Sequence, residues 1–214
     1  MKRLILALLL GLQVGCTSWH YRVAGDRVIF GIRSWNHDPL DYTVEGADAR
    51  SFRSLNDGYA LDKYHVYLEG DRIENADPST FTILKDGYSK DKNHIFLRTC
   101  ALKGADPGTW SLIAEYWSRD ANRVYQGYWN IPGAKPATFR YIRDCWAIDD
   151  ARAYHHITSY PADCSVPLTN PFNRLTIFND VDVATFDVID SFRARYARQL
   201  FDALNGTVEL SQKK

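Results

Sequence analysis

The sequence lacks a surplus of either charge. Lysine and arginine number 26 among 214 residues, and aspartate and glutamate also number 26, so the formal net charge is zero. Proteins that bind nucleic acid rely on basic surfaces that neutralise phosphates, and this composition gives no reason to expect such a partner. The chain also has no G-x-S-x-G, no phosphate-binding glycine loop and no H-E-x-x-H. We therefore expect no catalytic centre and no cofactor.

Metal-ligand spacings are missing as well. No histidine–cysteine spacing suits zinc. His65 and His94 share a column that holds arginine in later copies of a repeat, which indicates a solvated polar position. The neighbours His155 and His156 would point to opposite faces of a strand. Calcium needs six to eight oxygen ligands, whereas "KDKN" offers one carboxylate between lysines, so a turn-forming aspartate is the better interpretation.

Long apolar runs are absent except near the start of the chain. Leu4 to Leu12 follows the basic Lys2 and Arg3, is too short to cross a bilayer core of roughly 30 Å as a helix, and is typical of a signal peptide over residues 1–15. The ending "QVGC" resembles a bacterial lipobox, although Gln13 stands where leucine is usual. We expect lipidation at Cys16, with an ordinary signal peptide as the alternative.

The location follows from this expected leader. Thr17, rather than an acidic residue, follows Cys16, which favours an outer-membrane lipoprotein that faces the periplasm. Residues 16–25 are expected to link the lipid to the fold. The membrane would then be contacted through the N-terminal lipid.

Cysteines are few. Besides Cys16 there are Cys100, Cys145 and Cys164, and in an oxidising envelope two of these can pair. Cys145 and Cys164 lie 19 residues apart on either side of an irregular segment, so we favour that bridge and a buried thiol at Cys100. Three buried thiols are the alternative, because spacing does not fix connectivity.

The chain is rich in internal repetition. "YALDKYHVYL" (residues 59–68) and "YSKDKNHIFL" (residues 88–97) are near copies 29 residues apart. Four columns keep that step: Phe52, Phe81, Trp110 and Phe139; Ala47, Ala76, Ala105 and Ala134; Asp62, Asp91, Asp120 and Asp149; Val66, Ile95, Val124 and Ala153. Asp26 and Phe186 mark irregular first and last copies, the last with an insertion at about residues 155–172. We count five units, whose irregular ends would close the array.

Each unit contains two or three short strands. "HVYL" and "HIFL" are β-branched and aromatic and lie between turn residues. The predicted fold is therefore an all-β repeat array over residues 26–190, with solenoid-, meander- or propeller-like stacking. The tail differs, because Ile189, Phe192, Tyr196, Leu200 and Leu204 follow steps of three and four. That spacing predicts a capping α-helix over residues 183–205.

These motifs resemble the bacterial DKNYY repeat family. "LDKYHVY" and "KDKNHIF" carry the aspartate turn and the aromatic strand, and "NADPSTF" and "GADPGTW" carry the rest of the signature. The resemblance covers residues 26–143, with an echo at residues 182–189. It implies a repeat architecture, often on exported proteins or lipoproteins, and implies no reaction.

The aromatic residues outside the repeat columns are the candidates for a partner-binding surface, because deviations from a repeat concentrate on loops and binding faces. They are Trp35, Trp117, Tyr128, Trp129, Trp146 and Tyr160. The expected function is a non-enzymatic envelope lipoprotein that binds a protein partner, and simple burial is the alternative for each residue. Two other functions stay open: an immunity-type inhibitor of a secreted toxin, and a hydrolase that uses residues 155–171.

Overall fold

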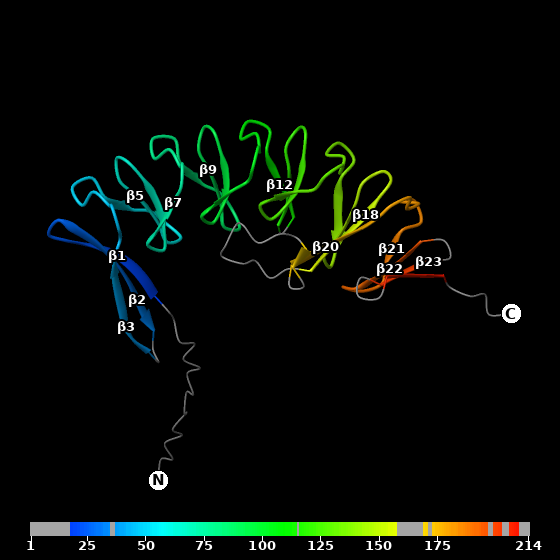
Figure 1. Ribbon diagram of the computed structural model, residues 1–214, viewed down its shortest axis with the longest axis horizontal. Helices are drawn as coiled ribbons and strands as arrows, with labels where there is room; N and C mark the ends of the chain where they lie inside the picture. Colours follow the sequence, from blue (N-terminus) through cyan, green and yellow to red (C-terminus); the bar gives the residue numbers. More distant parts are fainter. Residues whose placement is uncertain are drawn as a thin grey trace, which may run out of the picture. The chain divides into compact units, whose positions relative to one another are not determined.

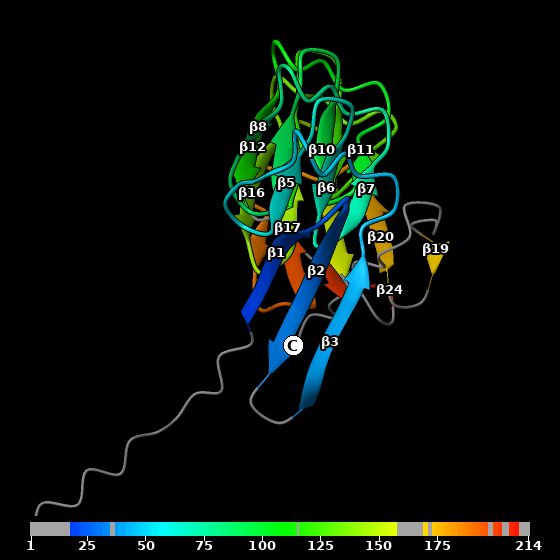
Figure 2. The same cartoon turned by 90° about the vertical axis from the view of Figure 1, so that its left-hand side faces the viewer.

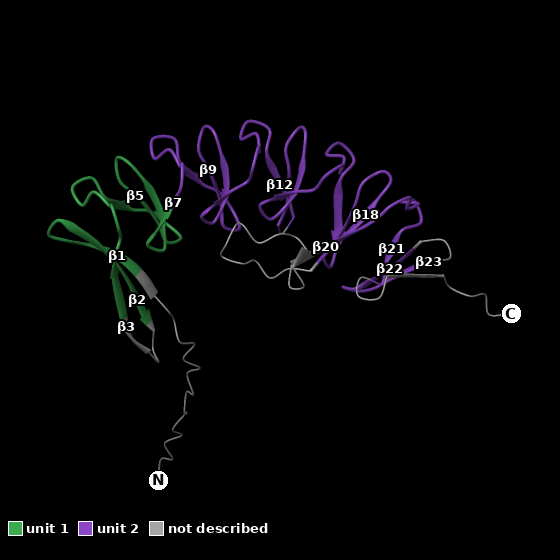
Figure 3. Ribbon diagram, viewed as in Figure 1, with its two compact units in different colours: residues 1–72 green, residues 73–214 purple. Residues whose placement is uncertain are grey.

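The computed structural model describes residues 18–34, 37–114, 116–157, 169–170, 173–196, 199–202 and 206–209 (Figure 1). All regular elements in these ranges are β-strands. Accordingly, no helix long and apolar enough to cross a membrane occurs among them. The chain divides into two compact units, residues 1–72 and 73–214 (Figure 3).

The first unit contains two antiparallel sheets, with the unit boundary inside the last strand of the second. Sheet A has the order β1-β2-β3, and sheet B has the order β4-β5-β6-β7. The strands are β1 (Ser18–Ala24), β2 (Arg27–Ser34), β3 (His37–Thr43), β4 (Arg53–Ser54), β5 (Tyr59–Leu61), β6 (Val66–Leu68) and β7 (Asp71–Ile73).

The second unit contains four further sheets, C to F. Their orders are β11-β10-β9-β8, β12-β13-β14-β15, β16-β17-β18-β20-β19 and β21-β22-β23-β24. The strands are β8 (Thr82–Ile83), β9 (Tyr88–Lys90), β10 (Ile95–Leu97), β11 (Cys100–Ala101), β12 (Ser111–Ala114), β13 (Trp117–Arg119), β14 (Val124–Gln126), β15 (Trp129–Asn130), β16 (Arg140–Arg143), β17 (Trp146–Ile148), β18 (Ala153–Ile157), β19 (Thr169–Asn170), β20 (Asn173–Phe178), β21 (Asp187–Val188), β22 (Arg193–Tyr196), β23 (Gln199–Asp202) and β24 (Gly206–Glu209).

The repeat of the sequence is a repeat of strand register. In the two central strands of each sheet a small residue faces a large aromatic one: Ala60 pairs with Tyr67, Ser89 with Phe96, Ser118 with Tyr125, and Ala147 with Tyr154. Directly opposed side chains share one face of a sheet, so the small residue leaves room for the ring. The predicted all-β fold is confirmed, with several small antiparallel sheets.

Neighbouring sheets within a unit stack face to face. Strands β14 and β17 are buried at every position. Alternating burial would indicate one solvated face, so continuous burial means that both faces are covered. The hydrophobic clusters follow this pattern: Ile95 of sheet C shares one with Tyr125 of sheet D, and Trp146 of sheet E shares one with Phe201 of sheet F. One short sheet has too little apolar surface to be stable alone, and stacking supplies the core.

The helix expected over residues 183–205 is wrong. Within the described residues this segment forms strands β21, β22 and β23 of sheet F. The Oδ1 of Asp190 accepts the backbone N–H of Phe192 and of Arg193, both at 2.9 Å, so another aspartate turn interrupts the apparent helical spacing. Val188 and Ala194 oppose each other and face the cluster around Trp146. Sheet F therefore packs on sheet E.

Two other boundaries also differ from expectation. Residues 18–24, expected as part of a linker, form strand β1, which pairs with β2 from Ser18 opposite Arg33 onward. The insertion expected near residues 155–172 falls between the paired strands β18 and β20 of sheet E. Residues 1–17, including Cys16, lie outside the described residues.

Candidate functional site

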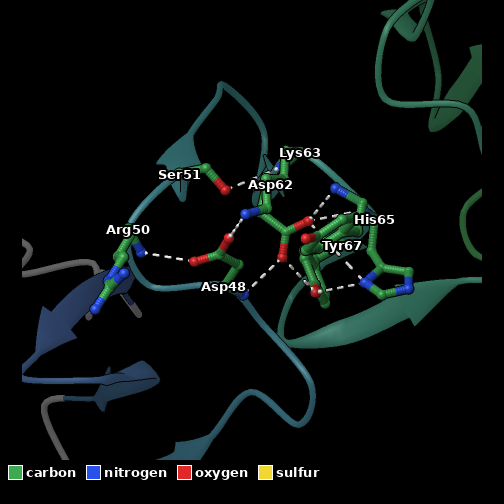
Figure 4. Close-up of polar contacts among 8 residues, drawn as sticks. Asp48, Arg50, Ser51, Asp62, Lys63, His65 and Tyr67 are labelled. Atoms are coloured by element: carbon green, nitrogen blue, oxygen red, sulfur yellow. Dashed lines mark hydrogen bonds and ion pairs between the residues drawn. The ribbon is translucent and has the colours of Figure 1, made fainter.

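One buried aspartate organises the turn between the two central strands of a sheet. Asp62 is 1% exposed and lies between β5 and β6 (Figure 4). Its Oδ1 accepts the backbone N–H of Tyr64 and His65, both at 2.7 Å. Its Oδ2 accepts the N–H of Asp48 at 2.8 Å and the hydroxyl of Tyr67 at 2.9 Å. The carboxylate thus closes its own turn and also ties it to the preceding loop.

The same contacts recur at 29-residue steps. In Asp91, Asp120 and Asp149, one oxygen accepts the N–H groups two and three residues later, and the other accepts the N–H group 14 residues earlier. Asp190 repeats the first two bonds, and the Arg193 side chain also donates to its Oδ2. The aspartate column predicted from sequence is therefore a column of buried turn anchors.

A tyrosine five residues later completes three of these turns. Tyr67, Tyr125 and Tyr154 donate their hydroxyls to the respective aspartates. The copy that contains Asp91 has Phe96 at this position, and there the Nδ1 of His94 lies 3.4 Å from the Oδ2 of Asp91. The other histidine of this column, His65, has its Nδ1 3.4 Å from the Tyr67 hydroxyl. Both histidines are thus part of a turn.

The hydrogen bonds set the ionisation of these groups. Burial alone would raise the carboxyl pKa of Asp62, Asp120 and Asp149, but the donated hydrogen bonds outweigh burial and hold each pKa below its ordinary value. Burial, followed by the bond to a carboxylate, raises the hydroxyl pKa of Tyr67, Tyr125 and Tyr154. Each pair is therefore held as an ionised carboxylate and a neutral phenol.

An ion pair crosses the surface of the same turn. Lys63 Nζ lies 2.8 Å from an oxygen of Asp48, and Lys92 Nζ lies 2.8 Å from an oxygen of Asp77. In the fourth copy the charges are exchanged, because Lys135 stands at the aspartate position and Asp150 at the lysine position, again at 2.8 Å. The exchange preserves an attraction, which indicates that the pair supports the turn and that neither charge is reserved for a ligand.

The turn aspartates have little remaining capacity to bind a ligand or to act in catalysis. An ionised carboxylate only accepts hydrogen bonds, and that of Asp62 already accepts four in a buried position. Across the part of the chain that the structure describes, no group of three or more histidine, cysteine, aspartate or glutamate residues could hold a metal ion. These aspartates act as structural elements of the repeat.

The paired histidines of sheet E are core residues. His155 and His156 are each 1% exposed. The ring of His155 lies 4.5 Å from that of Trp146, whereas the ring of His156 lies edge-on to Trp117 at 6.3 Å. They contact different tryptophans, as expected for neighbours on one strand. A hydrolase would need a histidine that reaches its substrate, and residues 158–168 of the insertion lie outside the described residues.

The aromatic candidates for partner binding are mostly part of the core. Trp117, Tyr128 and Trp146 are buried, so the expectation that they form a binding surface is wrong. Each opens a strand or turn whose two faces are covered by stacked sheets, which the sequence pattern does not reveal. Trp129, on the outer strand β15, is half-buried against Tyr128 with ring centroids 4.1 Å apart. Trp35 and Tyr160 lie outside the described residues.

The cysteine pairing differs from the favoured bridge. Cys100 is disulfide-bonded, whereas Cys145 remains a thiol. The bridge between Cys145 and Cys164 is therefore wrong, and so is a thiol at Cys100. Cys100 lies on β11 within the cluster between sheets C and D. The spacing of the cysteines did not predict the disulfide of Cys100, because the stacking of sheets can bring distant segments together. Cys164 itself lies outside the described residues.

The structure adds a groove that the sequence did not indicate. It has a volume of about 400 Å³ and is lined by Ile83, Leu84, Lys85, Trp110 and Leu112. The lining comes from the first strands and adjoining turns of sheets C and D, and all but Lys85 are half-buried. Trp110 belongs to a repeat column, which suggested only a core position. The sequence feature that could have predicted this groove is the run of apolar residues in "FTIL" and "WSLI", because such short strands can bury only part of that apolar surface.

Comparison with known proteins gives a family but no relative of known role. The family model described as "DKNYY family" matches residues 35–157 and, in a second match, residues 65–202. No curated protein and no solved structure matches the chain.

Proposed function

The chain belongs to the DKNYY family, and from this premise we propose that it is a non-enzymatic lipoprotein of the cell envelope whose sheet array binds a protein partner. The groove along β8 and β12 is the observation that carries the proposal. The buried aspartates and histidines are used in turns and core contacts, whereas the groove is a concave surface with a mostly apolar lining among the described residues. Neither rival function has a specific described feature in its favour.

The chemistry of the groove suits a protein segment. Ile83, Leu84 and Leu112 offer partly exposed aliphatic surface, and the half-buried ring of Trp110 adds a broad apolar wall. Aromatic and aliphatic pockets of this kind accept anchor side chains at protein interfaces. Lys85 at the rim is exposed and adds a positive charge, which favours a partner with an acidic residue beside its apolar anchor.

The outer strands themselves are less suited to pairing with a partner strand. β8 has only two residues, and β12 carries an irregularity in its register between Leu112 and Ala114. Short and bulged edges discourage strand addition. We therefore assign recognition to side chains in the groove and not to backbone pairing.

Photo-crosslinking in intact cells tests the groove. A photoreactive amino acid at Leu84 should give a discrete protein adduct, and Leu112→Asp should abolish that adduct by placing a charge in the apolar wall. The matched control is Ser111→Asp, because Ser111 is the exposed neighbour on the same strand and should leave the adduct intact. No adduct from Leu84, or an equal loss with Ser111→Asp, would contradict a groove partner. Both variants should unfold at the same temperature as the parent chain, which would exclude unfolding as the cause of a lost adduct.

Lipidation has a separate test. The full chain should gain acyl mass at Cys16 when produced in a bacterium that processes lipoproteins, and should fractionate with the envelope membranes. Cys16→Ser should remove the acyl mass and release the protein from the membrane fraction. An intact chain that carries no acyl group, or a mature chain that begins elsewhere, would overturn the lipoprotein part of the proposal.

A further inference from the structure

Sheet A of the first unit is longer than the sheet that covers it. Its strands have seven, eight and seven residues, whereas the strands of sheet B have two or three. Figure 2 shows β1, β2 and β3 extending past β5, β6 and β7. The covered part is tied down by Tyr21, whose hydroxyl donates to the carbonyl of Gly58 and accepts the N–H of Gly70.

One face of sheet A is apolar along its length. The register places Tyr21, Phe30 and Tyr42 in one row across the three strands, and sets Ile32 opposite Leu40 in the next row. Val28 and Phe30 are buried in a cluster with Ala60 and Tyr67 of sheet B. Sheet B thus covers the half of this face next to the β1–β2 turn.

Among the described residues of the first unit, none of sheet B covers the other half of the apolar face. Leu40 is 57% exposed, Tyr42 is 39% exposed and Ile32 is half-buried. We call these three residues the overhang. The ring of Tyr42 lies 5.5 Å from that of Phe30, so the overhang continues the core cluster outward. A contiguous apolar surface of this kind marks an interaction site more often than scattered single residues do.

The opposite face of sheet A carries a cluster of charged side chains, beside the buried Ile29. Asp41 pairs with Arg22 at 2.9 Å and with Arg33 at 2.7 Å. The two arginine hydrogen bonds lower the carboxyl pKa of Asp41 to about 2, so the cluster stays ionised over the ordinary pH range. Sheet A is therefore amphipathic, with a solvated charged face and an apolar overhang.

The overhang lies close to the expected lipid attachment point. Only Thr17 separates Cys16 from β1, and the row that contains Ile32 and Leu40 pairs with Trp19, three residues after Cys16. At roughly 3.3 Å per residue, three residues span about 10 Å. An acyl-bearing Cys16 would sit at the edge of the hydrocarbon region, so this row lies within reach of the bilayer interface.

We propose that the overhang rests on the lipid surface beside the acylated Cys16 and forms a second membrane contact. This inference rests on the lipoprotein part of the proposed function. The contact is apolar, because the overhang carries no charged side chain and the cluster of Asp41, Arg22 and Arg33 lies on the opposite face of the sheet, so we expect it to form without anionic lipid. Tyr42 suits this position, since a ring with a polar hydroxyl favours the interface between hydrocarbon and water.

Photoactivatable lipids test the contact without depending on lipidation in the cell. The chain from residue 16 onward, with Cys145→Ser, is coupled through Cys16 to a maleimide phospholipid in phosphatidylcholine vesicles. The vesicles also contain a phospholipid with a photoreactive acyl chain. Adducts are mapped by mass spectrometry, and we expect them on the peptide that contains Leu40 and Tyr42. The peptide that contains Asp48 and Arg50 serves as the internal reference.

Paired variants make the result specific. Leu40→Ser combined with Tyr42→Ser should lower adducts on β3 to the level of the reference peptide. Thr43→Ser, on the opposite face of β3, should leave them unchanged. Adducts absent from β3, or adducts on β3 that the double variant leaves unaffected, would overturn the inference. Because the anchor is attached chemically, this failure is distinguishable from a failure of Cys16 acylation in cells.

Discussion

The hydroxyl of Tyr67 donates a 2.9 Å hydrogen bond to the carboxylate of Asp62, and both groups are buried inside the stack of sheets. The bond recurs between Tyr125 and Asp120 at 2.8 Å. It links the turn between two central strands to the aromatic ring that fills the next layer of the core. The repeat therefore couples turn geometry and core packing through one pair of side chains.

Removing this hydroxyl should destabilise the fold. We expect Tyr67→Phe to lower the free energy of unfolding by about 1.5–3 kcal/mol, the usual range for a hydrogen bond to a charged group. The control is Tyr64→Phe, because Tyr64 is 60% exposed on the same turn and should have little effect. Urea titration followed by fluorescence measures both. Equal effects of the two variants would show that the buried bond has no special role.

Phe96, which stands where three other copies have tyrosine, allows the reverse experiment. Phe96→Tyr should place a hydroxyl beside Asp91, as in the other copies, and raise the free energy of unfolding by about 1 kcal/mol. Phe96 and Ser89 oppose each other, and a serine also faces Tyr125 in the next copy, so the site tolerates the ring of tyrosine. A lower denaturation midpoint would contradict the equivalence of the copies.

Removing the carboxylate should have a larger effect than removing the hydroxyl. Asp62→Ala leaves the N–H groups of Asp48, Tyr64 and His65 without their acceptor. Each buried donor that loses its partner costs about 1–3 kcal/mol, so we expect a loss of at least about 3 kcal/mol. Asp71→Ala, at an exposed position in the same unit, should be nearly neutral. A small effect at Asp62 would mean that water replaces the carboxylate.

Stability should fall at both pH extremes. The carboxyl pKa of Asp62, Asp120 and Asp149 is lowered on folding, so their contribution is present above about pH 3.9 and is lost as the pH falls below it. The phenol pKa of Tyr67, Tyr125 and Tyr154 is raised, so their contribution is full below about pH 10 and is lost above it. Denaturant titration over pH 2–12 measures both limits, and a flat profile below pH 3.9 would contradict the first. Replacing the three tyrosines with phenylalanine should reduce the alkaline loss, and the part that remains should come from Tyr21 and Tyr88, whose pKa values burial also raises.

The disulfide assignment can be checked directly. Cys100→Ser should remove the disulfide seen by non-reducing peptide mapping, and should lower stability because a cross-link typically contributes about 2–4 kcal/mol. Cys145→Ser should leave that disulfide in place. We expect the partner of Cys100 to be Cys164, because Cys16 is the expected lipidation site. A mapped bridge that contains Cys145 would contradict the assignment.

The sequence predicted most of the strands and turns, but it predicted little of which side chains are exposed. The aspartate column identified turns because an isolated carboxylate between strand patterns has few other uses, and the structure places these residues in buried turns. The predicted helix in the tail is wrong because Ile189, Phe192, Tyr196 and Leu200 follow steps of three and four by coincidence. A turn at Asp190 separates Ile189 from Phe192, and Tyr196 and Leu200 belong to two different paired strands, β22 and β23. Periodicity over so few residues cannot distinguish one helix from two short strands.

By itself the sequence determined the 29-residue period, the strands and the turn aspartates, because these depend on local hydrogen bonds and on neighbours within one repeat. Only the tertiary structure decided which aromatic residues are buried, which cysteine is bridged and where apolar surface remains open. Those properties depend on how one sheet covers the next. Trp117 is buried because sheets D and E share a cluster around it, whereas Leu40 is exposed because the short strands of sheet B end before they reach it.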